Sequence, residues 1–173
     1  CADSGAYAEE GEDQPEASEM MAASTAVTNS LMGLHGITQQ SIVATAEMLS
    51  DELYAYQPTE EVRTAAGLLA HIANSQYFFC STAAGEESPI TENLEETLET
   101  KADIVAAVGE SFAYCATVYG QMDDATGAEM VSLMGNDMAK SAILAFNSAH
   151  NYEHYGNLVT YMRLNGITPP SSM

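Results

Sequence analysis

Residues 145–170, AFNSAHNYEHYGNLVTYMRLNGITPP, decide the fold because they combine a helical pattern with two histidines placed four residues apart. Inward-facing positions recur every three or four residues through His150, His154 and Leu158, which is the spacing of one face of an α-helix. The glycine and prolines near the end of the stretch stop the helix. The pattern therefore predicts a long helix over residues 138–164 with both imidazoles facing the protein interior.

Three segments upstream also have helical length and periodicity, and together they predict an all-α protein. The predicted helices are residues 23–49, 62–83, 100–119 and 138–164, with a short helical turn between residues 121 and 137. Pro58 disfavours helix in the residue before it, and Thr59 can cap the start of the second helix. No segment shows sustained strand alternation or a hairpin turn. The expected fold is a four-helix bundle, and its long connections allow an order other than up-down-up-down.

The paired histidines lie close enough on one helix face to reach the same metal ion, but two imidazoles alone make a weak site. His71, within LLAHIANSQYFF, lies on the inward face of the predicted second helix and can supply a third ligand. Asn74 and Gln76 on neighbouring turns are candidate hydrogen-bond partners for it. We therefore predict that His71, His150 and His154 bind a divalent transition metal. Three imidazoles leave its identity open between zinc, nickel, iron, copper and manganese.

Other interpretations of the histidines stay open at this stage. A single inward histidine is usually a hydrogen-bonded core residue rather than a ligand. His35 lies between two glycines, off the apolar stripe that runs through Leu34 and Ile42, so we expect it to be exposed or at the core boundary. The H-x-x-E-H pattern of inverted zinc metalloproteases also matches, with Glu153 as general base. Those enzymes need an acidic ligand further downstream, and no acidic residue follows His154.

The charge of the chain excludes whole classes of partner. It contains 25 acidic residues against four Lys and Arg, a formal net charge of −21 at pH 7, which repels phosphate backbones and anionic lipid surfaces. We therefore expect no nucleic-acid partner. The excess of carboxylates also resembles proteins from saline habitats, where salt screens the repulsion. No Gly-rich phosphate loop or Ser-His-Asp grouping is present. No stretch approaches the roughly 20 apolar residues that a membrane-spanning helix needs.

The first residues differ in composition from the rest. Cys1 is followed by ADSGAYAEEGEDQPEASE, an acidic run of small residues that cannot bury enough apolar surface to fold alone. We predict a flexible acidic tail over residues 1–19 and one bundle domain over residues 20–173. A cysteine before such a tether resembles a mature bacterial lipoprotein. Cys1 is therefore the predicted lipidation site, the cell envelope or surface is the predicted location, and the lipid is the only predicted membrane attachment. The alternative is that the sequence begins at an arbitrary boundary.

Cys80 and Cys115 are candidate nucleophiles, but both fall on apolar helical faces, where a buried thiol more commonly acts as a small hydrophobe. They can also form a disulfide if the domain is exported. The sequence leaves these alternatives open.

The segments described so far resemble the DinB/YfiT-like superfamily over about residues 25–172. The resemblance rests on YQPTEEVRTAAGLLAHIANSQYFFCSTAAGEESP, FAYCATVYGQM and AFNSAHNYEHYGNLVTYMRLNGITPPSS, whose order and spacing agree with the family. It implies a four-helix bundle with up-down-down-up topology and a three-histidine metal site, with one ligand from the second helix and two from the fourth. By motif position these ligands are His71, His150 and His154. Despite its name, the family is not the translesion DNA polymerase.

The resemblance leaves the activity open. Some relatives are thiol-dependent transferases or isomerases, in which the metal lowers the pKa of a low-molecular-weight thiol, and a metal-dependent hydrolase is the other enzymatic expectation. An exported protein lies away from reduced intracellular thiols, which weakens the transferase interpretation. The competing hypothesis is a non-catalytic structural subunit of an envelope complex or extracellular polymer, forming a homo-oligomer or larger assembly through the N-terminal tail.

Overall fold

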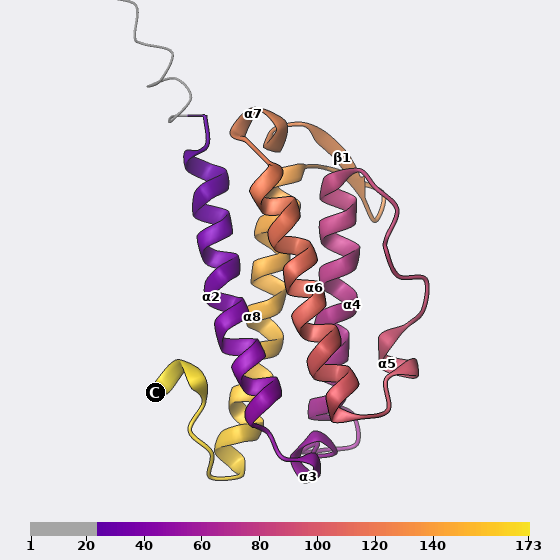
Figure 1. Ribbon diagram of the computed structural model, residues 1–173, viewed down its shortest axis with the longest axis vertical. Coiled ribbons are helices and arrows are strands. Elements are labelled where there is room, and N and C mark those ends of the chain that lie inside the picture. The colour runs from indigo at the N-terminus through magenta and orange to yellow at the C-terminus, as the bar shows by residue number, and fades with distance from the viewer. Residues whose placement is uncertain (1–23) are drawn as a thin grey trace, which may run out of the picture.

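The computed structural model describes residues 24–173, so the predicted tail and Cys1 lie outside the described residues. Four long helices form a bundle, which confirms the predicted all-α class (Figure 1). They are α2 (Ala26–Met48), α4 (Ala65–Ala84), α6 (Lys101–Gln121) and α8 (Lys140–Leu164). None of the helices in this part of the chain combines the length and apolar character that crossing a bilayer requires.

The helices follow the predicted up-down-down-up order. In Figure 1, α2 descends, α4 and α6 both ascend, and α8 descends. Around the bundle, α6 packs between α2 and α4, and α8 packs on the opposite side between the same two helices. Helices α4 and α6 are neighbours that run in the same direction, so a tight turn cannot join them. Residues 85–100 instead form a long connection that runs back along α4 and contains the short helix α5 (Leu94–Thr97) (Figure 1).

The second long helix begins later than the sequence indicates. Thr64, not Thr59, caps α4, and its hydroxyl accepts a hydrogen bond from the Gly67 amide at 3.0 Å. The chain between α2 and α4 instead forms the short helix α3 (Asp51–Tyr54), which starts at its own Ser50 cap. The end of α4 agrees with expectation, because Gly85 adopts φ 75°, the left-handed conformation that ends many helices.

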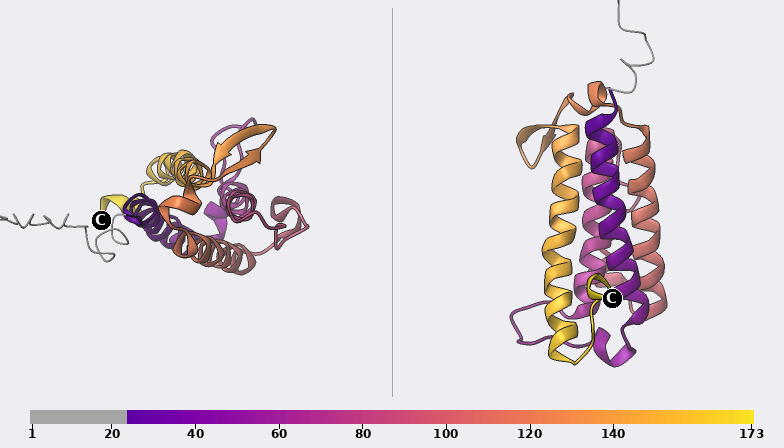
Figure 2. Two further views of the ribbon diagram at one scale, coloured as in Figure 1. Left: turned by 90° about the horizontal axis from the view of Figure 1, so that it is seen from above. Right: turned by 90° about the vertical axis from the view of Figure 1, so that its left-hand side faces the viewer.

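The connection between α6 and α8 contains a β-hairpin, so the expectation of no strands is wrong. After the short helix α7 (Asp124–Gly127), strands β1 (Met130–Leu133) and β2 (Asn136–Ala139) pair antiparallel. Met134 and Gly135 form the turn with φ 51° and 83°, the positive pair that tight hairpins require. Each strand has only four residues, too few to show a clear alternation of polar and apolar side chains. The turn dipeptide begins with Met134, so the sequence lacks the Asn-Gly or Asp-Gly pair that usually indicates a tight hairpin. Figure 2 shows the hairpin outside the ring of long helices.

The interior of the bundle has a polar layer between two apolar clusters. One cluster is built around residues such as Ile72, Phe112 and Leu158, and the other around Tyr119 and Ile143. Five polar side chains that fall between the two clusters along their own helices are at most 1% exposed: His35, Thr38, Gln76, Asn147 and Asn151. The Asn147 side-chain amide donates to Gln76 Oε1 at 2.9 Å, which joins α8 to α4 inside the core.

His35 is one of these buried residues, so its expected exposed or boundary position is wrong. It is 1% exposed and stacks on Tyr119 with 4.4 Å between ring centroids, while Leu34 is 46% exposed. Helix geometry gives the reason. At 3.6 residues per turn, His35 points within about 20° of Ile42, whereas Leu34 points about 80° away from it. Burial lowers the pKa of His35, and the nearby Phe112 carbonyl opposes that shift.

Cys80 and Cys115 form a disulfide that joins α4 to α6. Their Cα atoms are 5.4 Å apart, within the usual range for such a bond, and both side chains are fully buried. The structure therefore selects the disulfide from the alternatives that the sequence left open. A core disulfide of this kind persists in oxidising compartments.

Candidate metal centre

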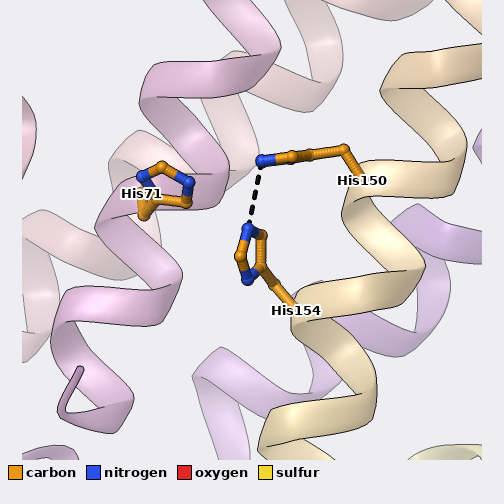
Figure 3. Close-up of side chains that lie close together, drawn as sticks. All are labelled: His71, His150 and His154. Carbon is orange, nitrogen blue, oxygen red and sulfur yellow. Dashed lines mark hydrogen bonds between the residues drawn. The ribbon is translucent and has the colours of Figure 1, made fainter. Parts of the chain in front are cut away.

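The three predicted ligands come together between α4 and α8. One ring nitrogen from each of His71, His150 and His154 can be chosen so that all lie within 4.8 Å of one another. Figure 3 shows His71 on one helix, with His150 and His154 approaching it from successive turns of the other. The α-helical spacing places the pair on one face of α8, and the packing of α4 against α8 adds the third imidazole.

The spacing of the nitrogens is compatible with a shared ion. His150 Nε2 and His154 Nε2 are 3.0 Å apart, and ligands of a tetrahedral zinc ion with Zn–N bonds of about 2.1 Å lie roughly 3.4 Å apart. The His71 ring centroid is 5.2 Å from that of His150 and 4.7 Å from that of His154. The candidate ligand atoms lie up to 4.8 Å apart, so the third nitrogen must approach the other two to complete a tetrahedral site.

The electrostatics keep the pair on α8 in the form that binds metal. Burial lowers the pKa of His150 to about 4, and repulsion from His154, His71 and Arg63 adds to the shift. Burial also lowers the pKa of His154, with a further contribution from His71. Both rings are therefore neutral at pH 7, the form that binds metal. The hydrogen bond between their Nε2 atoms needs a hydrogen on one of them, and that hydrogen must move to Nδ1 before both Nε2 atoms can bind an ion.

His71 has an acidic partner that the sequence analysis missed. Its Nδ1 lies 2.7 Å from Glu95 Oε1, and the other carboxylate oxygen accepts from Arg63 Nε at 2.8 Å. Burial raises the pKa of Glu95, but the hydrogen bonds and charges of Arg63 and His71 outweigh it, and the net shift is downward. The anionic carboxylate favours the tautomer with hydrogen on Nδ1. That leaves Nε2 of His71 for a metal, the arrangement common around metal-binding histidines.

The predicted partners Asn74 and Gln76 form no hydrogen bond with the His71 side chain in the described part of the chain. Gln76 bonds to Asn147 inside the core. Asn74 instead holds α5, because its Oδ1 accepts from the Leu94 amide at 3.0 Å and its Nδ2 donates to the Asn93 side chain at 2.6 Å. Asn74 therefore acts on His71 indirectly, by placing the short helix that carries the carboxylate.

The Nδ1 atoms of His150 and His154 are buried and have no hydrogen-bond partner within residues 24–173. Of the three rings, only His71 has a carboxylate partner for its Nδ1 atom. The site also has an open side, because the His71 side chain is 21% exposed. Phe79 packs edge-on against the His150 ring at 5.4 Å and forms an apolar wall next to it.

Glu153, the general base of the inverted-protease alternative, is exposed and is not part of the histidine cluster. The cluster contains no carboxylate ligand. The geometry therefore gives no support to that interpretation.

Comparison with known proteins agrees with this architecture. Residues 36–172 match the family model described as DinB family. The uncharacterized protein YjoA of Bacillus subtilis (strain 168) is 28% identical in an alignment of 130 residues that covers 71% of this chain and 80% of YjoA. The crystal structure of the DinB-like YjoA superposes with a TM-score of 0.67 at 21% identity, over 80% of this chain and 93% of that chain.

Another solved structure, a DinB-like protein from Bacillus cereus, gives a TM-score of 0.67 at 17% identity, over 77% of this chain and 89% of that one. These structures support the fold, and the family model covers most of the chain. The bundle, its helix order and the matched residues together show that this chain belongs to the DinB family.

Proposed function

We propose that this protein binds one divalent transition-metal ion through His71, His150 and His154. The observation that carries the proposal is the convergence of three imidazoles from two helices within 4.8 Å. The donor set fits such an ion, because the pair on α8 is neutral at pH 7 and Glu95 orients the third ring. Zinc, nickel, iron, copper and manganese all accept imidazole ligands, so a metal analysis must identify the ion.

The chemistry of this site is that of an open metal centre. Three protein ligands leave at least one position for water or substrate, and a bound ion there lowers the pKa of a coordinated water or thiol. The chain itself supplies ligand orientation through Glu95 and an apolar wall through Phe79. We propose a metal-dependent hydrolase or thiol-dependent transferase as the reaction class. The non-catalytic alternative depends on the N-terminal tail, which lies outside the described residues.

We further propose that the protein is exported to the cell envelope. The Cys80–Cys115 disulfide supports this location, because such bonds are rare in reducing cytoplasm. Lipidation of Cys1 stays a prediction. Alkylation of free thiols in intact cells, followed by denaturation, tests the location. We expect Cys80 and Cys115 to be protected until a reductant is added, and immediate alkylation of both would contradict export.

The first experiment is metal analysis of protein purified from its native source without added metal. About one equivalent of a transition metal is expected in the wild type, and the His150→Ala, His154→Ala double variant should lose it. A Tyr152→Ala, Asn157→Ala double variant changes exposed residues of the same helix and serves as the control. Circular dichroism verifies that all three proteins are helical. Wild-type protein without metal, or metal retained by the histidine variant, would overturn the proposal.

A further inference from the structure

A second concave site lies at the end of the bundle where α2 meets α3 and where α4 and α6 begin, at the bottom of Figure 1. The cavity has a volume of about 1160 Å³, which is large enough for a small organic molecule. None of the three histidines lines it, and none of its lining residues comes from α8. It is therefore separate from the candidate metal centre.

The interior of this cavity is apolar. Its lining includes Tyr54, which belongs to the hydrophobic cluster around Ile72 and Phe112. Ala66, Leu98 and Val105, also in the lining, are partly buried and pack against the same cluster. Tyr54 is 5% exposed, and its hydroxyl donates to the Ala46 carbonyl at 2.6 Å, so the ring is held in one orientation. A ligand with an aliphatic or aromatic part would cover this apolar surface.

The rim of the cavity is acidic, with three carboxylates against one basic residue in the lining. Glu47, Asp51 and Glu99 line it, and all three are exposed. None of them forms an ion pair with another residue in the range 24–173. Low-dielectric walls beside such carboxylates concentrate their field and attract cations.

The one basic residue in the lining offsets at most one of the three carboxylate charges. Lys101 directs its ammonium group to the backbone carbonyls of Leu49 and Glu47, at 2.6 and 3.0 Å. This group satisfies the C-terminal end of α2 and lies 5.7 Å from the Tyr54 ring centroid. The lining therefore keeps a net negative charge, and its carboxylates form no ion pair within residues 24–173, so they can bind a positive ligand.

We propose that this cavity binds an organic amine, whose ammonium group lies among Glu47, Asp51 and Glu99 and whose apolar part lies against Tyr54 and Val105. The combination of an apolar floor with unpaired carboxylates matches an amphiphilic cation and disfavours an anion. A neutral apolar molecule would form no ion pair with the rim carboxylates. The inference does not depend on the metal site.

Fluorescence titration with dansylcadaverine, which joins an aromatic group to a primary ammonium, tests the proposal on the full-length protein. We expect saturable binding to the cavity. A Glu47→Gln, Asp51→Asn, Glu99→Gln triple variant should bind about tenfold more weakly, as expected for the loss of three partly exposed ion pairs. The Glu47 substitution leaves its backbone carbonyl, and hence the Lys101 contact, in place.

The control must separate this site from general attraction to an acidic protein. A Glu86→Gln, Glu110→Gln, Asp137→Asn triple variant makes the same change in net charge at exposed positions outside the cavity and should bind like the wild type. A dansyl probe of similar length that ends in a carboxylate should bind more weakly. Equal losses in the two triple variants, equal affinity for the two probes, or no saturation would each overturn the proposal.

A steric variant locates the probe independently of charge. Ala102 lines the cavity and is exposed, so Ala102→Trp fills the space without altering the core, and it should reduce dansylcadaverine binding. Ala113→Trp, three turns further along the same helix and outside the cavity, is the matched control. His71→Ala should leave binding unchanged. Undiminished binding to a folded Ala102→Trp protein would place the probe elsewhere and refute the assignment.

Discussion

Replacing Glu95 with alanine should weaken metal binding without unfolding the protein. The carboxylate accepts a hydrogen bond from His71 at 2.7 Å and pairs with Arg63 at 2.8 Å on its other oxygen. Its removal frees the His71 ring to rotate and to adopt the wrong tautomer. It also leaves Arg63 without its anionic partner beside the cation site. Both effects lower the affinity for the metal ion, although all three histidine ligands remain in place.

The magnitude follows from the place of Glu95 in the site. Loss of a partner behind a metal-binding histidine typically reduces metal affinity by about 10- to 100-fold, or roughly 1.4 to 2.7 kcal/mol. The Glu95 side chain is 24% exposed, so water can replace part of its hydrogen bonding. We therefore expect a loss near the lower limit, about tenfold. Glu95→Gln retains an acceptor oxygen for His71 and should lose less.

Competition with a chromogenic chelator measures the affinity for Zn²⁺, and the visible absorption of bound Co²⁺ reports the ligand geometry. Glu95→Ala should alter both. Glu92→Ala removes an exposed carboxylate from the same connection and should alter neither. The Arg63→Ala, Glu95→Ala double variant should bind more tightly than Glu95→Ala, because the positive charge of Arg63 opposes a cation at this site.

The reasoning would be refuted if Glu95→Ala bound Zn²⁺ within twofold of the wild type and gave the same Co²⁺ spectrum. Metal binding by the wild type together with that result would reject the role of Glu95 and leave the three-histidine site intact. A wild type that binds no metal would reject the site itself.

Two further predictions concern stability. The Cys80–Cys115 bond spans a sequence separation of 35, and loop-closure entropy of that length corresponds to about 4 kcal/mol, so urea unfolding with and without reductant should differ by an amount of that order. A difference under about 1 kcal/mol would contradict that contribution. Because the pKa of His35 in the folded state lies below its usual 6.5, its contribution to stability is complete above pH 6.5 and declines as the pH falls below it. The metal-free His35→Phe variant should therefore lose less unfolding free energy between pH 7 and 5 than the wild type, and equal losses would show that His35 does not titrate in this way.

The helices and the histidine pair could be predicted from the sequence because their signals are local. A spacing of four residues puts His150 and His154 on one face of any α-helix, whatever surrounds it. Helical periodicity likewise located both ends of each of the four long helices to within three residues, although the cap of α4 is Thr64 rather than Thr59. Periodicity also placed His71 on the inward face of its helix, and the resemblance to a family added the helix order and indicated the same three ligands.

Local patterns could not identify the partner of His71. Glu95 is one of several glutamates in the connection over residues 85–100, and composition does not distinguish them. A signal for α5 was present, because Asn93 and Glu96 have the spacing of a helix-capping pair and do form a hydrogen bond at 2.8 Å. Even so, only the packing of α5 against Asn74 brings one particular carboxylate to His71.

The sequence by itself determined the helical class, the acidic charge and the inward face of α8. Tertiary structure decided that His35 is buried, that Cys80 pairs with Cys115, and that Glu95 reaches the histidines. The physical reason is the range of the interactions. Periodicity records which way a side chain points from its own helix, whereas a pairing between helices depends on their relative rotation and height, which the packing of the whole core sets.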